Sequence, residues 1–169
     1  GPFVNLGFKN RNAFSSLEII DLQGNFSIQG ISNIEGESAT YSLFQYGGSA
    51  GITFPKFILL NSDRVLSKVG PINPQSRLSL SYNYENRIDE YERSITELGF
   101  SYLWRREDRS RFNFSPLTFS LVDIQKLEGD FEDFLDNQEA NGNGALKAAF
   151  NSAVINSAYF EAIYNFAPA

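Results

Sequence analysis

The sequence contains no cysteine, no histidine and no methionine. Without cysteine the chain has neither disulfides nor thiolate metal sites, and without histidine it lacks the usual imidazole base and metal ligand. It has no run of about 18 apolar residues, which excludes a transmembrane helix but leaves membrane-spanning strands open. Because a primary translation product needs an initiating methionine, we expect the 169 residues to be a processed or excised piece of a longer protein.

Basic residues are few and scattered, with 14 Lys and Arg against 20 Asp and Glu and a net charge of −6. Nucleic-acid surfaces are basic and clustered, so no nucleic-acid partner is expected. The sequence has no phosphate-binding loop, nucleophile–base pair or metal-ligand spacing. We therefore predict no enzyme activity, no catalytic residue, no cofactor and no metal. The acidic segment from Glu128 to Glu139 lacks the alternating ligand spacing of a calcium loop and is interpreted as a solvated helix.

Apolar and polar residues alternate with a period of two in seven separate stretches of the chain. Successive side chains of a strand point to opposite faces, so each stretch predicts a strand with one apolar and one polar face. The cleanest stretch runs from Arg77 to Glu85, and the others are 4–9, 20–28, 44–54, 97–105, 111–122 and 157–166. Pro116 interrupts the alternation of the sixth stretch, which predicts a bulge there.

Connections between the predicted strands are mostly short, as an up-and-down antiparallel sheet requires. We expect them at 12–18, 31–39, 55–75, 86–93, 107–110 and 123–154. In the last connection apolar residues recur three and four positions apart, which predicts a helical insert at about 124–153. Asp130 is expected to cap its first helix, Asn141–Gly144 to break the chain, and Ala145–Ala153 to form a second helix.

The solvent that meets the apolar faces decides the fold class. A soluble sandwich buries two apolar faces against each other, whereas a membrane barrel turns them to lipid and its polar faces to a wet lumen. The expected strands of about 9–13 residues suit a tilted membrane span of roughly 9–11 residues. Aromatic residues lie towards strand ends, and glycines interrupt the polar faces. We therefore predict an all-β fold, an antiparallel up-and-down transmembrane β-barrel. Bacterial single-chain barrels have an even number of strands, whereas this sequence predicts seven. Residues 1–169 are therefore expected to form one partial barrel domain.

This fold class assigns strand residues to lipid or to the lumen. The residues predicted to face lipid are Leu78, Leu80, Tyr82, Tyr84, Leu98, Phe100, Tyr102, Trp104, Phe160 and Tyr164. The residues predicted to face the lumen are Arg77, Ser79, Ser81, Asn83, Glu85, Glu97, Ser101 and Glu161. The three carboxylates in this second set are interpreted as lumen-lining groups paired with Arg77, Arg105 or Lys9 rather than as catalysts.

Three segments resemble one family, the BamA/TamA outer-membrane protein assembly barrels (the surface antigen family). They are the strand–turn–strand Val4–Glu18 with Asn10-Arg11-Asn12-Ala13-Phe14 at its turn, the aromatic–proline turn Thr53–Phe57, and Arg111–Leu117 followed by the acidic insert and Tyr159–Phe166. In the first segment Ser15 and Ser16 replace glycines that the family uses. The resemblance implies the N-terminal half of the barrel, roughly strands two to eight of about sixteen.

The resemblance also implies a function, which is to insert or translocate other outer-membrane proteins without chemistry of its own. The implied location is the bacterial cell outer membrane, with the turns at 12, 55 and 107 in the periplasm and the loops at 31, 86 and 123 outside. The implied partners are outer-membrane lipid, the remaining barrel strands, client outer-membrane proteins and accessory assembly subunits. Two alternatives stay open: a passive outer-membrane porin or transporter barrel, and a soluble β-sandwich binding module.

Overall fold

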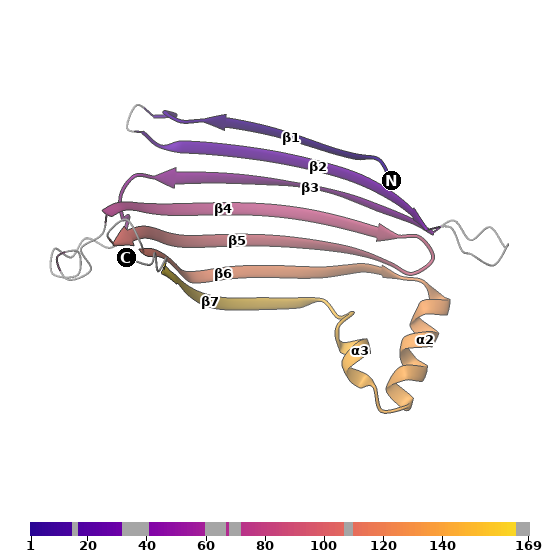
Figure 1. Cartoon of the computed structure of the whole chain (residues 1–169). Helices are drawn as coiled ribbons and strands as arrows, with labels where there is room; N and C mark the ends of the chain where they lie inside the picture. The colour runs from indigo at the N-terminus through magenta and orange to yellow at the C-terminus, as the bar shows by residue number, and fades with distance from the viewer. Residues whose placement is uncertain (15–16, 32–40, 60–66, 68–71, 107–109, 165–169) are drawn as a thin grey trace.

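One antiparallel sheet makes up most of the molecule. The computed structural model describes residues 1–14, 17–31, 41–59, 67, 72–106 and 110–164. Its strands are β1 (Phe3–Asn10), β2 (Ile19–Ile31), β3 (Tyr41–Phe54), β4 (Ile72–Arg87), β5 (Tyr91–Arg106), β6 (Ser110–Leu127) and β7 (Ala153–Tyr164). Each strand pairs with its neighbours in sequence, so the strand order is β1 through β7 (Figure 1). The predicted all-β, up-and-down antiparallel topology is confirmed.

Several strands are longer than the alternation predicted. β4 and β5 each have 16 residues and β6 has 18. The connection expected at 86–93 is only a three-residue turn, because the Glu90 N–H donates to the Arg87 carbonyl (3.0 Å) and Asp89 adopts a positive φ of 65°. Aspartate tolerates this left-handed conformation better than most residues, which allows the tight turn.

The start of β4 was also predicted wrongly, since the connection expected to reach Gln75 ends before Ile72. Pairing with β5 is irregular between Ile72 and Gln75, and Asn73 has a positive φ of 50°. This irregularity removes the period-two pattern from the sequence there, although the residues still belong to a strand. The connections expected at 31–39 and 107–110, and the last two residues of the stretch ending at 166, lie largely outside the described residues.

Pro116 marks a bulge, as predicted. The pairing register shifts between Phe100 and Tyr102 of β5, where Leu117 and Phe114 of β6 are the respective partners. A second shift occurs opposite β7 between Ser115 and Thr118. Because proline has no N–H to donate to the ladder, it is tolerated where pairing is interrupted. The one extra residue keeps Phe114 and Leu117 on one face of the sheet although their sequence phase differs.

The helical insert between β6 and β7 is confirmed, with narrower bounds than predicted. It contains α2 (Gly129–Ala140) and α3 (Gly144–Ala148), and the flanking strands extend to Leu127 and from Ala153. The predicted cap at Asp130 is wrong, because Glu128 precedes the helix and no side chain caps it. The second helix is shorter than the predicted 145–153. The break between the helices is confirmed by Gly142, whose φ is 87°.

The sheet is a single layer with little hydrophobic core. The buried hydrophobic side chains in the described part of the chain are Tyr91, Tyr102 and Leu135, and no second sheet packs there. Tyr102 is covered by the loop after β3, since it contacts the Phe57 ring at 5.3 Å and donates a hydrogen bond to the Ile58 carbonyl (2.8 Å). Neither described helix is long and apolar enough to cross a membrane.

Candidate membrane surface and polar wall

One face of the sheet carries most of the large apolar residues of the seven strands, although some, such as Phe3, Ile95 and Ile163, lie on the other face. The register pairs Leu80 with Ala50 on one side and with Leu98 on the other, and Leu98 with Phe119. Every residue predicted to face lipid lies on this apolar face, although Tyr102 is only 5% exposed under its covering loop. Leu80 is 50% exposed and Phe160 is 59% exposed. That this face meets lipid stays a prediction.

Aromatic side chains gather at both ends of the apolar face. The first aromatic row is Phe26, Phe44, Tyr46, Tyr82 and Tyr84, whose neighbouring ring centroids are 4.9–6.4 Å apart. The second aromatic row is Phe57, Trp104, Phe112 and Tyr164, with neighbouring centroids 5.2–5.9 Å apart. Between the rows lie aliphatic residues, including Ala50, Leu80, Leu98 and Leu117, together with the aromatic residues Phe100, Phe114, Phe119 and Phe160.

The separation of the aromatic rows can be compared with the apolar band of a membrane barrel. Tyr84 pairs with Ser94, which is ten residues before Trp104 in β5. At roughly 3.4 Å per residue the rows are therefore about 34 Å apart along the strand. A tilt of about 40° reduces this to about 26 Å along the normal, close to the roughly 25 Å apolar band of outer-membrane barrels.

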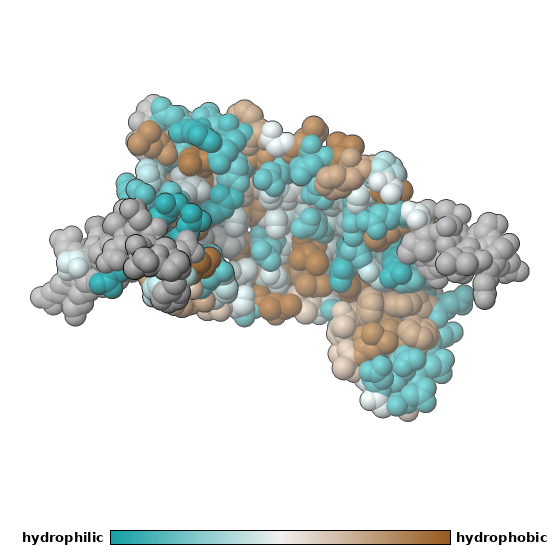
Figure 2. All heavy atoms as spheres, viewed as in Figure 1, coloured by the Kyte–Doolittle hydropathy of each residue, from teal (hydrophilic) through white to brown (hydrophobic). Residues whose placement is uncertain are grey.

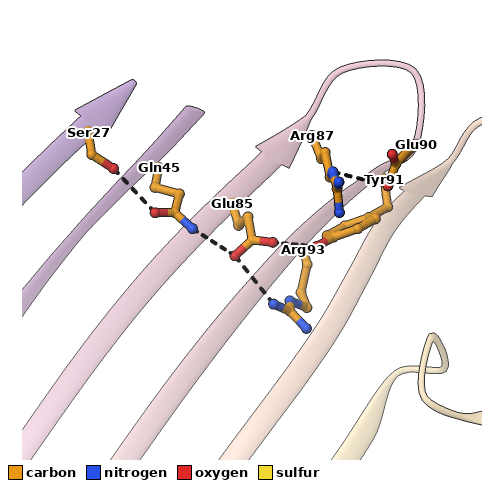
Figure 3. Close-up of polar contacts among 7 residues, drawn as sticks. All are labelled: Ser27, Gln45, Glu85, Arg87, Glu90, Tyr91 and Arg93. Carbon is orange, nitrogen blue, oxygen red and sulfur yellow. Dashed lines mark hydrogen bonds and ion pairs between the residues drawn. The ribbon is translucent and has the colours of Figure 1, made fainter. Parts of the chain in front are cut away.

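The opposite face carries a hydrogen-bonded polar wall that crosses four strands (Figure 3). Ser27 of β2 donates to Gln45 of β3 (3.2 Å), and Gln45 donates to Glu85 of β4 (3.0 Å). Arg93 of β5 donates to the same carboxylate at 3.3 Å, and the Tyr91 hydroxyl donates to its other oxygen. Glu85 therefore joins β3, β4 and β5 through side chains as well as backbone.

All the residues predicted to face the lumen lie on this polar face. The basic partners predicted for the three carboxylates of this set are wrong. Glu85 pairs with Arg93. Glu97 accepts a hydrogen bond from Ser120 (3.2 Å), and Glu161 lies opposite Asn113 in the register. Within the described residues none of these carboxylates forms an ion pair with Arg77, Arg105 or Lys9.

Arg77 is occupied by Asp21, which lies two strands away across a glycine. The Arg77 guanidinium donates to both Asp21 oxygens, at 2.6 and 2.9 Å, and to Thr53 at 3.1 Å. Gly51 of the intervening strand leaves the space for this contact. A Cβ at Gly51 would lie 2.4 Å from Arg77 Nη2 and 2.7 Å from Asp21 Oδ2. The glycine is therefore required for the ion pair to form in this geometry.

Gly47 repeats the arrangement four residues earlier in β3. A Cβ there would lie 2.3 Å from Asn83 Oδ1 and 3.1 Å from Asn25 Oδ1, so side chains of β2 and β4 converge over it. Hollows of about 190, 370 and 210 Å³ lie along the polar face, lined mainly by amide and charged residues. Glycine in a strand often marks a position where another group approaches closely, and here side chains of the two neighbouring strands fill the space above Gly47.

Tyr91 connects the polar wall to the helical insert. Its ring contacts Phe131 (6.0 Å) and Phe150 (5.2 Å), whose own rings are 5.0 Å apart. Leu135 of α2 is 1% exposed. In Figure 2 the apolar part of the insert lies nearer the sheet, and its hydrophilic part lies farther away. The insert is thus docked on the end of the sheet rather than carried on a bare loop.

Lys147 joins the two helices of the insert. Its ammonium binds Asp136 at 2.8 Å and Glu139 at 2.7 Å. These contacts, with Asp136 the larger contributor, raise the pKa of Lys147. Because the folded pKa is raised, the stabilisation is present at neutral pH and is lost only as the pH rises through that strongly alkaline value. Two carboxylates of the acidic segment therefore already have a cationic partner.

Removing the Tyr91 ring is expected to undock the insert. Tyr91→Ala loses ring packing worth about 3 kcal/mol, whereas Tyr91→Phe keeps the ring and loses one hydrogen bond worth about 1.5 kcal/mol. Helices of 12 and 5 residues do not persist alone. Hydrogen exchange of the α2 and α3 amides should therefore accelerate by roughly two orders of magnitude in Tyr91→Ala. In Tyr91→Phe it should stay near the wild-type rate, because the lost hydrogen bond joins Tyr91 to Glu85 and not to the insert. Unchanged exchange in Tyr91→Ala would show that the insert is held elsewhere.

Sequence reasoning missed the two contacts that organise the polar face. Neither the Asp21–Arg77 pair nor the position of Tyr91 at the insert was predicted, because both depend on register between distant segments. The sequence offered one signal for the Asp21–Arg77 pair, which is that Gly47 and Gly51 lie on the polar face of their strand and leave space there for side chains of neighbouring strands.

The chain matches no family model, no curated protein and no solved structure. The resemblance to the BamA/TamA barrels stays a prediction.

Proposed function

We propose that residues 1–169 form part of the wall of a bacterial outer-membrane β-barrel, with the apolar face toward lipid and the polar wall toward an aqueous lumen. One observation carries this proposal. Within the described residues a single-layer sheet leaves most of an apolar face uncovered across seven strands, and aromatic rows bound that face at both ends. Soluble monomers rarely expose contiguous apolar patches larger than a few hundred Å². Lipid is the solvent that makes such a face favourable.

The open edges of the sheet support a partial barrel. Within the described residues β1 pairs only with β2, and β7 pairs only with β6. In an antiparallel meander of seven strands the two edge strands run in the same direction. Antiparallel closure therefore takes an odd number of further strands, and a second copy in the same orientation would leave parallel seams. Further barrel strands fit these edges better than a symmetric dimer does.

The barrel's proposed role is to insert or translocate other outer-membrane proteins, without chemistry of its own. The support for this role is the resemblance of Val4–Glu18, Thr53–Phe57 and Arg111–Leu117 to the assembly barrels. Clients of such a barrel are themselves strands, which pair with exposed sheet edges by β-augmentation. Its partners are outer-membrane lipid, the remaining strands, client proteins and accessory subunits.

The test is client folding in liposomes that contain the protein of which residues 1–169 are part. We expect urea-unfolded outer-membrane proteins to fold faster there than in empty liposomes or in liposomes with an unrelated porin. Equal folding rates in all three would contradict an assembly role.

A second candidate is a passive porin, favoured by the charged polar wall and its hollows. It predicts steady ion conductance across a planar bilayer together with no effect on client folding. The same preparation therefore separates the two functions.

A further inference from the structure

The chain that follows β3 folds back over the apolar face of the sheet. Phe57 contacts the Tyr102 ring at 5.3 Å and the Trp104 ring at 5.9 Å. Both partners are predicted to face lipid, so residues 55–59, here called the strap, lie on the side assigned to lipid. The strap is at the end of the sheet opposite the helical insert, the left end in Figure 1.

Two side chains of the apolar face hold the backbone of the strap. The Ile58 N–H donates to the Ser76 hydroxyl (2.9 Å), and the Ile58 carbonyl accepts from the Tyr102 hydroxyl (2.8 Å). Ser76 and Tyr102 are direct partners in the register of β4 and β5, and they are 0% and 5% exposed. Both polar backbone groups of Ile58 are therefore satisfied by side chains that the strap itself covers.

This arrangement is what irregular backbone needs beside a membrane. The hydrocarbon interior offers no hydrogen-bond partners, so non-helical backbone is tolerated next to it only where protein groups satisfy its N–H and C=O groups. Pro55 has no N–H, which removes one donor from the strap. In water the groups of Ile58 would be satisfied by solvent without two buried hydroxyls.

Leu59 ends the described part of the strap in a strained and exposed conformation. Its φ is 68°, a left-handed conformation that costs energy for a residue other than glycine. Leu59 is 86% exposed, and no large hydrophobic residue in the described part of the chain is more exposed. Backbone strain that leaves a leucine uncovered is doubly unfavourable in water, because exposed apolar surface also costs free energy there.

We propose that the strap is an interfacial membrane anchor, in which Phe57 and Leu59 contact phospholipids at the boundary between headgroups and acyl chains. The inference rests on the proposed membrane location, which puts the second aromatic row at headgroup level. Phe57 belongs to that row although it lies outside the strands. Lys56 is exposed beside it, and the long lysine stem allows its ammonium to reach headgroups and water. The strap thereby sets the depth of this end of the sheet.

The test is a spin label at Leu59→Cys in the protein that contains residues 1–169, reconstituted in liposomes. The measured quantity is the ratio of collisions with oxygen to collisions with an aqueous nickel chelate. We expect this ratio at position 59 to lie between the values for Phe100→Cys and Ser101→Cys, which report the apolar and the polar face. A ratio as low as that at 101 would place the strap in water. Poor access of both reagents would show that protein covers it. Either result would overturn the anchor.

Loss of the two hydrogen bonds should release the strap. Ser76→Ala/Tyr102→Phe removes both partners of Ile58 and keeps the ring at 102. The ratio of detached to attached strap, read from the two components of the Leu59→Cys spectrum, should rise about 25-fold, about fivefold for each hydrogen bond. Ser81→Ala/Tyr82→Phe makes the same chemical change elsewhere in β4 and should leave the spectrum unchanged. An unchanged spectrum in Ser76→Ala/Tyr102→Phe would refute the attachment, and circular dichroism checks that both variants keep their strands.

Failure of this inference is distinguishable from failure of the proposed function. Lipid contact at position 100 together with water contact at position 59 would refute the anchor and leave the barrel wall intact. Water contact at both positions would refute the membrane location on which the anchor rests.

Discussion

Leu80→Arg is expected to lower the free energy of unfolding in liposomes by about 2–4 kcal/mol, whereas Ser81→Arg should cost less than about 1 kcal/mol. Leu80 lies in the middle of the apolar face between Ala50 and Leu98. A guanidinium there would lose its water in the lipid interior. Ser81 is the next residue, but it lies on the polar face opposite Glu97. In the proposed barrel an arginine at 81 would keep lumen water and gain a carboxylate partner.

Urea titration of the reconstituted protein measures this difference, with circular dichroism reporting strand loss. Leu80→Gln is the matched control for size and polarity without charge, and it should fall between the wild type and Leu80→Arg. Equal costs for arginine at positions 80 and 81 would mean that the two faces meet the same solvent. A larger cost at 81 would mean that the faces have been assigned in reverse.

Gly51→Val is expected to destabilise the sheet by about 1–3 kcal/mol, although valine is otherwise favoured in strands. The new side chain would occupy the space in which Arg77 binds Asp21, so the ion pair must open. Gly24→Val is the matched control, because a Cβ at Gly24 has no contact closer than 4.0 Å. The control should be neutral or stabilising in the same urea titration.

A double-mutant cycle shows whether the ion pair is the cause. Asp21→Asn should be costly in the wild-type sheet and nearly neutral once Gly51→Val has separated the pair. Retention of the full cost in the double variant would mean that Gly51→Val acts through backbone strain. Wild-type stability in Gly51→Val would contradict the role assigned to the glycine.

The sequence was a good guide to strand identity and to faces, because a period of two is a local property. The sequence was a poor guide to strand ends, where irregular pairing or a tight turn interrupts the period-two alternation of apolar and polar residues. Residues 72–75 pair irregularly with β5, and Asp89 allows a turn shorter than its polar flanks suggest. The insert was predicted from its three-and-four spacing, but its bounds were not, because a register shift near Arg93 disturbs the end of β6.

Partners on the polar face could not be read from the sequence. Asp21 and Arg77 are 56 positions apart and meet only because two register choices and one glycine bring them together. Tyr91 looked like part of a connection, and its docking role depends on Phe131 and Phe150 folding back from the insert. Alternation assigns a residue to a face, but register between strands determines what it touches.

The central claim, that the apolar face meets lipid, is tested most directly by spin labels on consecutive positions of β5. The chain has no cysteine, so single cysteines at positions 97, 98, 100 and 101 label without background. In liposomes, labels at 98 and 100 should collide readily with oxygen and poorly with an aqueous nickel chelate, and labels at 97 and 101 should do the opposite. Nickel access at 98 and 100, or the absence of any alternation, would contradict the account.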